Sequence, residues 1–408
     1  MQLKKYTNGT HRHCTPEQTL EKISPVLQDM GITRVANLTG LDNIGIPVIG
    51  VYRPNSKSLA TSQGKGHSVN AAKVSGIMES IEGFHAENIK LKTITDSHES
   101  LNSKLDYQLL SRSSAKDFDD KTIIRWVECH SIKNNSPVWL PYELIHTEFT
   151  TPTQEDAGYF IADSNGLASG NTITEAINHG LYEVIERDCL ALWQLTPQEV
   201  HHKNRINLST ITDSYLQPIL NKLIEKNVNV GIWDITNDIG IPTFLCKVIS
   251  ANNTGIRPAY GSGTHLNKTI ALSRAITEAA QSRVTFIAGA RDDQYHDVYE
   301  NEISNTTYNS WLDELQNINT DLLKSFKDIP CTNFQSLDED QAYTLSQLDK
   351  VGLNDAFYAD LTQEKYNIPV VKVIIPGTEG ITAPGRRLLG SRGLKFYKQY
   401  GVGACEVK

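Results

Sequence analysis

The positions of apolar and polar residues predict a chain that mixes helices with short strands. Thr15 followed by Pro16 is typical of a helix start, and apolar residues recur behind it at helical spacing up to Gly31. Residues 32–55 contain β-branched runs broken by turn residues, which predicts strands joined by short turns. Helical spacing returns over 71–87, after a glycine-rich turn.

The remainder of the chain continues this alternation. A second long helix is predicted over 174–193, and a third, rich in alanine, follows a Gly-Ser-Gly turn. Between them, residues 211–227 predict a helix, and 228–250 predict two strands joined by an Asn-Asp-Ile-Gly turn. Residues 296–350 are polar and predict a helical insertion. We therefore expect the α+β class, with mixed or antiparallel sheets flanked by long helices and a cleft between helical faces.

The stretch 171–187 carries more negative charge on one side than a packed helix favours. At about 100° per residue, Glu175, Glu183 and Glu186 fall within roughly 80° of one another around the axis. Like charges at this spacing repel, and Arg187 alone does not neutralise three carboxylates. A divalent metal ion is one explanation, and a solvated acidic face is the other.

A similar acidic pattern occurs on the helix predicted over 71–87. Glu79 and Glu82 lie one turn apart, and Ser75 lies one turn before Glu79. These two acidic helices could be pseudo-repeats that face each other across a cleft. The third predicted helix carries a further polar set: Arg274, Glu278, Gln281 and Arg283.

Length and composition limit the classes of function. A chain of 408 residues can bury a large core, and we expect one catalytic domain over 51–400, preceded by a segment, 1–50, that contributes to the site. A net charge of -8 argues against a nucleic-acid binder. No apolar run approaches about 18 residues, the length that crosses a membrane. The six cysteines form no Cys-x-x-Cys pair, so we expect a reduced, cytoplasmic protein.

Several single residues have two interpretations. The Gly-Lys-Gly turn around Lys65 lacks the Walker A spacing and is more typical of a tight turn than of a phosphate site. His179 lies one turn from two glutamates and is equally consistent with a site residue and with packing. Cys189 lies on the apolar flank of its helix, which favours a buried structural thiol over a nucleophile.

Three motifs in this order resemble the YcaO superfamily. They are GKG followed by SGIMESIE, then GNTITEAINHGLYEVIERD, then AITEAAQSRVTFIAGARDD. The resemblance covers most of the chain, and it implies ATP- and Mg²⁺-dependent activation of the backbone amide oxygen of a peptide. In one departure, Gly83 follows Glu82 where the first family motif often has arginine.

The resemblance also implies a set of site residues. The catalytic residues implied are Glu183, Glu186, Arg187 and Arg283. The metal ligands implied are Glu79, Glu82, Glu175, Glu183 and Glu186. The nucleotide contacts expected are Arg12, Thr19, Lys65, Ser75, Glu79, Asn171, Glu175, Glu278 and Gln281.

The region from 36 to 66 looks most like the stand-alone branch of the family found with TfuA-type partners. That likeness implies thioamide formation in a peptide, with a sulfur donor and a TfuA-like partner. Azoline formation from Cys, Ser or Thr is the alternative, and the end GVGACEVK lacks the proline-rich tail common in azoline-forming members. We also expect a homodimer, a peptide or protein substrate, and no membrane or nucleic-acid partner. Whether the substrate carries a leader peptide stays open.

Two hypotheses from other classes remain open. The chain could be a non-catalytic scaffold that binds a leader peptide or a partner, although it retains its acidic residues. It could also be a ligase of the glutamine-synthetase type, which surrounds ATP and metal with acidic residues and modifies a carboxylate instead of an amide.

Overall fold

The computed structural model describes residues 2–101, 105–151, 157–294, 297–300, 302–316, 322–381 and 387–400. Within them the chain forms three antiparallel sheets. The first sheet contains β1 (Arg34–Asn37), β2 (Val48–Tyr52) and β3 (Thr61–Lys65), and the second contains β9 (Val228–Asp234), β10 (Thr243–Ser250) and β11 (Ala259–Thr264). The third has the order β4-β5-β13-β14-β7, with β6 paired to β5. Its strands are β4 (Thr93–Ser97), β5 (Ile123–Ser131), β6 (Pro137–Pro141), β7 (Leu167–Ser169), β13 (Phe357–Asp360) and β14 (Val370–Ile374).

Three long helices each follow one strand directly. They are α2 (Val69–Glu87) after β3, α4 (Ile173–Trp193) after β7, and α7 (Lys268–Ala288) after β11. The side chains of Ser68, Thr172 and Asn267 accept hydrogen bonds from backbone N–H groups in the first turns. These caps satisfy donors that a helix leaves unpaired, and they explain why each helix begins where it does.

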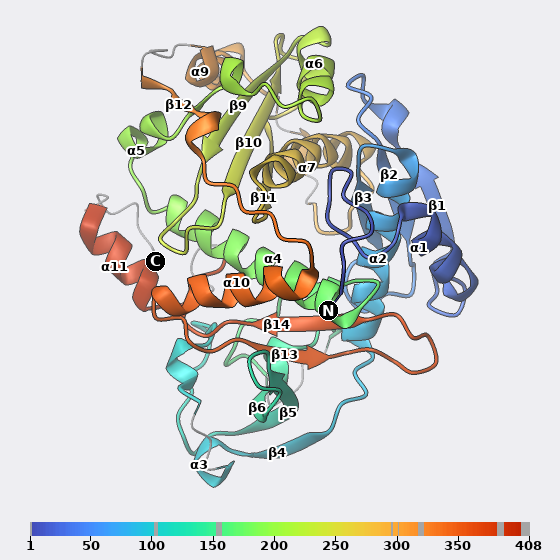
Figure 1. The fold of residues 1–408 in the computed structure, drawn as a ribbon, viewed down its shortest axis with the longest axis vertical. Coiled ribbons are helices and arrows are strands. Elements are labelled where there is room, and N and C mark those ends of the chain that lie inside the picture. The colour runs from blue at the N-terminus through green and yellow to red at the C-terminus, as the bar shows by residue number, and fades with distance from the viewer. Residues whose placement is uncertain are drawn as a thin grey trace.

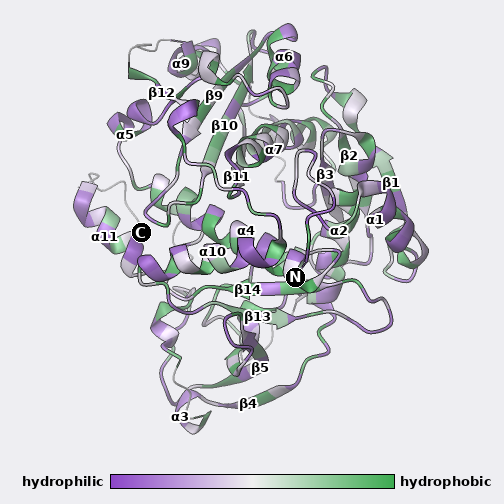
Figure 2. Cartoon of the chain, in the orientation of Figure 1, coloured by the Kyte–Doolittle hydropathy of each residue, from purple (hydrophilic) through white to green (hydrophobic). Residues whose placement is uncertain are grey.

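The three strand–helix units close into a ring (Figure 1). Each helix packs on the strands of its own sheet: α2 on β3 and β2, α4 on β14 and β7, α7 on β11 and β10. Each helix also contacts the strand that precedes another of the three helices: α2 contacts β7, α4 contacts β11 and α7 contacts β3. The three helices therefore surround a common centre. Figure 2 shows both hydrophobic and hydrophilic residues along α4, as expected of a helix that packs on a sheet and also faces this centre.

The remaining elements cover this ring. On α2 lies α1 (Pro16–Ile23), and on α4 lie α10 (Leu337–Lys350) and α11 (Ser391–Tyr400). Shorter helices are α3 (His98–Leu101), α5 (Gln198–Lys203), α6 (Gln217–Glu225), α8 (Asp297–Glu300) and α9 (Asn305–Gln316). A parallel pair joins β8 (Ile206–Asn207) to β12 (Lys324–Ser325). No helix among the described residues is both long enough and apolar enough to cross a membrane.

The expected α+β class and antiparallel sheets are confirmed. The helices expected over 71–87 and 174–193 are present with starts within two residues, and the Asn-Asp-Ile-Gly turn joins β9 to β10. The first helix ends at Ile23, well before the expected end at Gly31, because Pro25 lacks the N–H that continues an α-helix. The division into 1–50 and 51–400 stays a prediction, as does the insertion over 296–350, whose described residues include α8, α9, α10 and β12.

Glycines let the helices approach their sheets at backbone contact distance. A Cβ on Gly64 of β3 would lie 2.0 Å from the carbonyl oxygen of Ala72 on α2. A Cβ on Gly261 of β11 would lie 2.2 Å from the backbone nitrogen of Ala279 on α7. Neither neighbour is a flexible side chain, so the helices keep their places only if these positions carry no side chain.

We expect Gly64→Ala to lower the free energy of unfolding by about 1–3 kcal/mol or more, because it overpacks the contact between β3 and α2. Gly40→Ala is the control, since a Cβ on Gly40 meets no atom within 4 Å and should change stability by less than about 0.5 kcal/mol. Denaturant unfolding of both variants measures the difference. Equal stability of the two would show that the contact is not tightly packed.

Candidate active site

A cavity of about 970 Å³ lies where the three long helices meet. Its walls come from α2, α4 and α7, from β3 and β7, and from the N-terminal segment before α1. The predicted residues that line it are Arg12, Thr19, Lys65, Ser75, Glu79, Glu82, Asn171, Glu175, Glu183, Glu186, Arg187, Glu278 and Gln281. The two acidic helices thus face each other across the cavity, as expected, and α7 forms a third wall. That they are pseudo-repeats stays a prediction.

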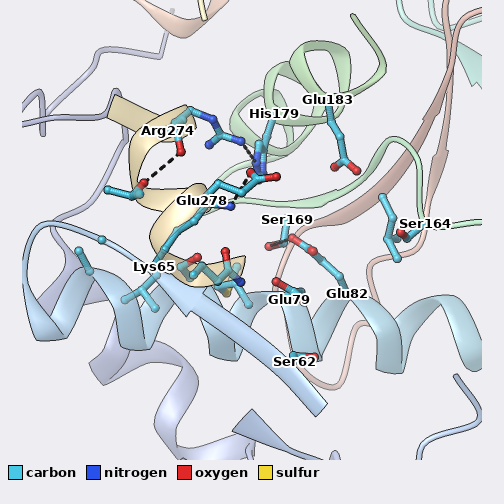
Figure 3. A pocket seen from close by; sticks show the side chains of 18 of the residues that line it. Ser62, Lys65, Glu79, Glu82, Ser164, Ser169, His179, Glu183, Arg274 and Glu278 are labelled. Atoms are coloured by element: carbon cyan, nitrogen blue, oxygen red, sulfur yellow. Dashed lines mark hydrogen bonds and ion pairs between the residues drawn. The ribbon is translucent and has the colours of Figure 1, made fainter. Parts of the chain in front are cut away.

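Carboxylates from two helices point into the same part of the cavity. Figure 3 shows Glu79 and Glu82 on α2 and Glu183 on α4, with Ser169 of β7 between them and Glu278. The Ser169 hydroxyl donates a hydrogen bond to Glu82 over 2.6 Å. Among the residues that the structure describes, no lysine or arginine forms an ion pair with Glu79 or Glu82. Lys65 and Arg187 pair instead with Glu278 and Glu183.

Burial sets the protonation of these groups. Desolvation raises the pKa of Glu82 well above its usual range, and the charges of Glu183 and Glu79 raise it further. Desolvation also raises the pKa of Glu183 to about 7, although Arg187 opposes the shift. The surface of Glu79 opens into the cavity, yet the surrounding protein still displaces enough water to raise its pKa. A bound cation would favour the charged form of all three carboxyl groups and so lower their pKa values.

Positive charge is concentrated toward the end of the cavity where α2 begins. The Lys65 ammonium lies 2.8 Å from the Glu278 carboxylate, and the two side chains are each about a fifth to a quarter exposed. Burial alone would raise the pKa of Glu278, but Lys65 and Arg187 outweigh it and lower that pKa. The Arg274 guanidinium lies 3.4 Å from Nε2 of His179, and its Nε has no partner among the described residues.

Two of the predicted metal ligands are held by the protein itself. Glu175 accepts hydrogen bonds from the backbone N–H groups of His13 (2.8 Å) and Asn171 (3.2 Å), and Arg12 lies 3.3 Å away. Glu186 accepts from the Ser262 hydroxyl and the Thr264 backbone N–H, which tie α4 to β11. Their role as metal ligands stays a prediction.

The cavity carries no complete metal cage. Among the residues that the structure describes, no three or more Asp, Glu, His or Cys side chains are placed to hold a metal ion together. Mg²⁺ is commonly held by only one or two carboxylates, with phosphate oxygens and water as its other ligands. The donor set of Glu79, Glu82 and Glu183 therefore fits Mg²⁺ that arrives with a phosphate group, and does not fit a metal bound by protein alone.

Arg283 does not lie at the site, contrary to the expectation. Its guanidinium pairs with Asp42 over 2.9 Å, and both side chains are almost fully buried away from the cavity. The reason is helical geometry: Arg283 lies two positions after Gln281, which turns it by roughly 200° to the other side of α7. Arg274, one turn before Glu278, lines the cavity instead, and that i,i+4 spacing was the available sequence evidence for it.

The structure also answers the open questions about single residues. The Cys189 thiol is buried against Thr243, and desolvation raises its pKa to about 12, as expected of a structural thiol. His179 lines the cavity, and burial lowers its pKa well below the usual value, so its imidazole is neutral at pH 7. The Thr19 hydroxyl donates to the Asn171 side chain over 3.0 Å, which joins the N-terminal segment to the start of α4.

The raised pKa of Glu183 makes stability depend on pH. A carboxyl whose pKa rises from 4.5 to about 7 on folding stabilises the folded state fully below pH 4.5, and this contribution is lost as the pH rises through about 7. We expect the melting temperature of the metal-free protein to fall more steeply over this range than that of Glu183→Gln. The control is Glu225→Gln, which changes an exposed residue of α6. Parallel melting curves for all three proteins would contradict the assignment.

Comparison with known proteins identifies relatives along most of the chain. A family model described as YcaO cyclodehydratase, ATP- and Mg²⁺-binding, matches residues 63–379. A protein from Methanothermobacter thermautotrophicus is 33% identical over 390 residues, which cover 92% of this chain and 98% of its own. A Rhizobium leguminosarum bv. trifolii protein from the tfuA 3′ region is 36% identical over 299 residues, which cover 71% of this chain and 70% of its own.

Solved structures share the fold. YcaO from Methanopyrus kandleri, bound with AMPPCP and Mg²⁺, has a TM-score of 0.72 at 19% identity and covers 94% of this chain and 99% of its own. A heterocyclase in complex with substrate and cofactor has a TM-score of 0.74 at 23% identity over 93% of this chain, which spans 54% of the heterocyclase. Together with the family match, these findings show that the chain belongs to the YcaO family of ATP- and Mg²⁺-binding proteins.

Proposed function

We propose that the protein phosphorylates a backbone amide oxygen of a peptide with ATP, and that a sulfur nucleophile then converts this amide to a thioamide. The observation that carries the first part is the cavity between the three long helices, in which cations at one end lie beside desolvated carboxylates from α2 and α4. A triphosphate is held by cations, and phosphoryl transfer depends mainly on positioning and charge.

The residues divide into two roles. Arg12, Lys65 and Arg274 hold the phosphate oxygens, because their charges face the cavity where α2 begins. Glu79, Glu82 and Glu183 would hold Mg²⁺, which would neutralise the charge that develops on the phosphates. The ion pair with Glu278 orients the Lys65 ammonium before the substrate binds, so this charge needs less reorientation during the reaction.

The chemistry balances in two steps. The amide oxygen attacks the γ-phosphorus, the bond to the β-phosphate bridging oxygen breaks, and ADP leaves. Hydrosulfide then adds to the amide carbon, the carbon–oxygen bond breaks as phosphate departs, and a thioamide remains. An amide oxygen is a poor leaving group, and phosphorylation makes it a good one. The protein contributes mainly the placement of both partners and the exclusion of water.

Thioamide formation is supported by similarity to the Rhizobium relative from the tfuA 3′ region. We propose that a TfuA-like partner delivers the sulfide. Azoline formation is the second candidate, because the family description names a cyclodehydratase and one solved neighbour is a heterocyclase. In that reaction the attacking group is the side chain of a Cys, Ser or Thr within the peptide.

Labelling the backbone amide oxygen with ¹⁸O tests the first step. We expect the label in the released phosphate, and we expect product formation only when ATP, Mg²⁺ and a sulfide source are all present. The paired variant Glu183→Ala with Glu186→Ala should reduce both ADP release and product to background, because it removes two cavity carboxylates. Mass spectrometry of peptide and phosphate measures the result.

Other outcomes of this experiment have definite meanings. Loss of water from a Cys-containing peptide without sulfide would assign azoline formation. Label retained in the peptide amide, with a modified carboxylate elsewhere, would assign a ligase of the glutamine-synthetase type. Unchanged turnover in the paired variant would exclude these carboxylates from the reaction.

A further inference from the structure

The cavity is longer than its cationic end. Along α2 the lining residues run from Ala71 to Gly83, which at 1.5 Å per residue spans about 18 Å. Its volume of about 970 Å³ lies at the upper end of the range of roughly 300–1,000 Å³ that holds a drug-sized ligand. A nucleotide bound at the start of α2 leaves the other end of the cavity for a second group.

We call this other end the distal lobe. It comprises Ser58, Leu59, Gly83, Thr147, Phe149, Ala162, Asp163 and Ser164, all of which line the cavity. Figure 3 shows Ser164 beyond Glu82 and Glu183, on the side away from Lys65 and Arg274. The glutamates that hold charge in the cavity therefore separate the distal lobe from the cationic end.

Among the described residues, the cations near the distal lobe are each paired with a carboxylate: Arg187 with Glu183 over 4.0 Å, and Lys372 with Asp163 over 3.6 Å. Arg53 lies beside the lobe, and its guanidinium makes two hydrogen bonds to the Glu87 carboxylate, at 2.5 and 2.7 Å. Arg291, at the margin, pairs with Asp293 over 2.5 Å. The group that fits this lobe is therefore one without phosphate charge.

Gly83 keeps the floor of the lobe open. A Cβ at this position would lie 3.1 Å from Nη2 of Arg53 and 3.7 Å from the Ser58 hydroxyl, so the glycine allows both groups to lie against α2. The backbone N–H of Thr147 donates to Ala86 over 3.2 Å and that of Phe149 donates to Lys57 over 2.9 Å. These bonds fix the wall beside Gly83 in place.

The same wall offers groups that a peptide can use. Thr147 is 3% exposed, and its hydroxyl has no hydrogen-bond partner among the described residues although Thr147 borders the cavity. A buried hydroxyl without a partner is costly, and rotation of this side chain toward the cavity would let a backbone N–H or C=O of a ligand satisfy it. Phe149 is 50% exposed, and it lines the cavity together with Leu59, so both provide apolar surface for a ligand side chain.

We propose that the distal lobe binds the peptide residue next to the activated amide, and that it selects an uncharged, apolar side chain at that position. This inference rests on the proposed function for the identity of the ligand as a peptide. An acidic side chain is excluded because the cations beside the lobe are already paired with protein carboxylates, so a desolvated carboxylate of the ligand would find no partner. Apolar area on Leu59 and Phe149 favours a side chain such as leucine.

Two capped pentapeptides test the lobe: Ac-Gly-Gly-Leu-Gly-Gly-NH₂ and its counterpart with glutamate at the central position. Binding to the protein saturated with AMPPCP and Mg²⁺ is measured by ligand-observed NMR. We expect the leucine peptide to bind about fivefold or more tightly than the glutamate peptide, and Phe149→Ala to remove about this advantage. Gly83→Leu should weaken the leucine peptide similarly, because it fills the floor of the lobe.

Controls separate this inference from the proposed function. Ile123→Ala truncates an apolar residue that is 64% exposed and lies outside the cavity, so it should leave both peptides unaffected. AMPPCP affinity should stay within about twofold in every variant. Equal binding of the two peptides, or an intact leucine advantage in both lobe variants, would overturn the lobe assignment. If the protein bound the peptides as expected but did not bind AMPPCP, the proposed function would be wrong and the assignment of the distal lobe would stand.

Discussion

The structure depends on holding several carboxyl groups together where the surrounding protein displaces water. Glu79, Glu82 and Glu183 come from two helices that are far apart in the sequence, and burial raises the pKa of each. Placing several carboxylates in such a site is unfavourable unless a cation joins them. The fold must therefore supply enough packing elsewhere to keep the site assembled while it is empty.

That packing comes from the three strand–helix units. Glycines on β3 and β11 bring α2 and α7 into backbone contact with their sheets, so the helices have little freedom to move apart. On α4, Glu175 and Glu186 accept hydrogen bonds from the N-terminal segment and from β11. These two anchors lie on either side of Glu183 along the helix. They fix its position while its own carboxylate stays available to a ligand.

The sequence predicted the helices well because their start points depend on local chemistry. Pro16 and the N-cap residue Thr15 act within one turn of chain, and the acidic stripes follow from spacing alone. The same spacing argument, carried further, separates Arg283 from Gln281 and places Arg274 with Glu278. Spacing does not show which residue of a distant segment a side chain will contact.

Glu175 illustrates the limit. It bonds to the backbone of His13, which lies 162 positions away in the chain, and no periodicity reveals such a pair. Arg53 and Glu87 form a similar case beside Gly83, where the missing side chain makes room for a guanidinium supplied by β2 and its following turn. The identity of the helices was thus readable from the sequence, whereas the partners that determine which carboxylates are free required the three-dimensional structure.

The raised pKa of Glu183 also bears on how a polyanion enters an acidic cavity. Because its pKa is raised to about 7, this carboxyl is partly protonated at neutral pH when no cation is bound, which reduces repulsion of an incoming triphosphate. When a cation binds beside it, the charged form becomes favoured and the proton leaves. The desolvation that raises this pKa therefore also reduces the electrostatic repulsion that a triphosphate meets on binding. The attraction between the carboxylate and the cation reaches full strength only after the cation has bound and the carboxyl group has lost its proton.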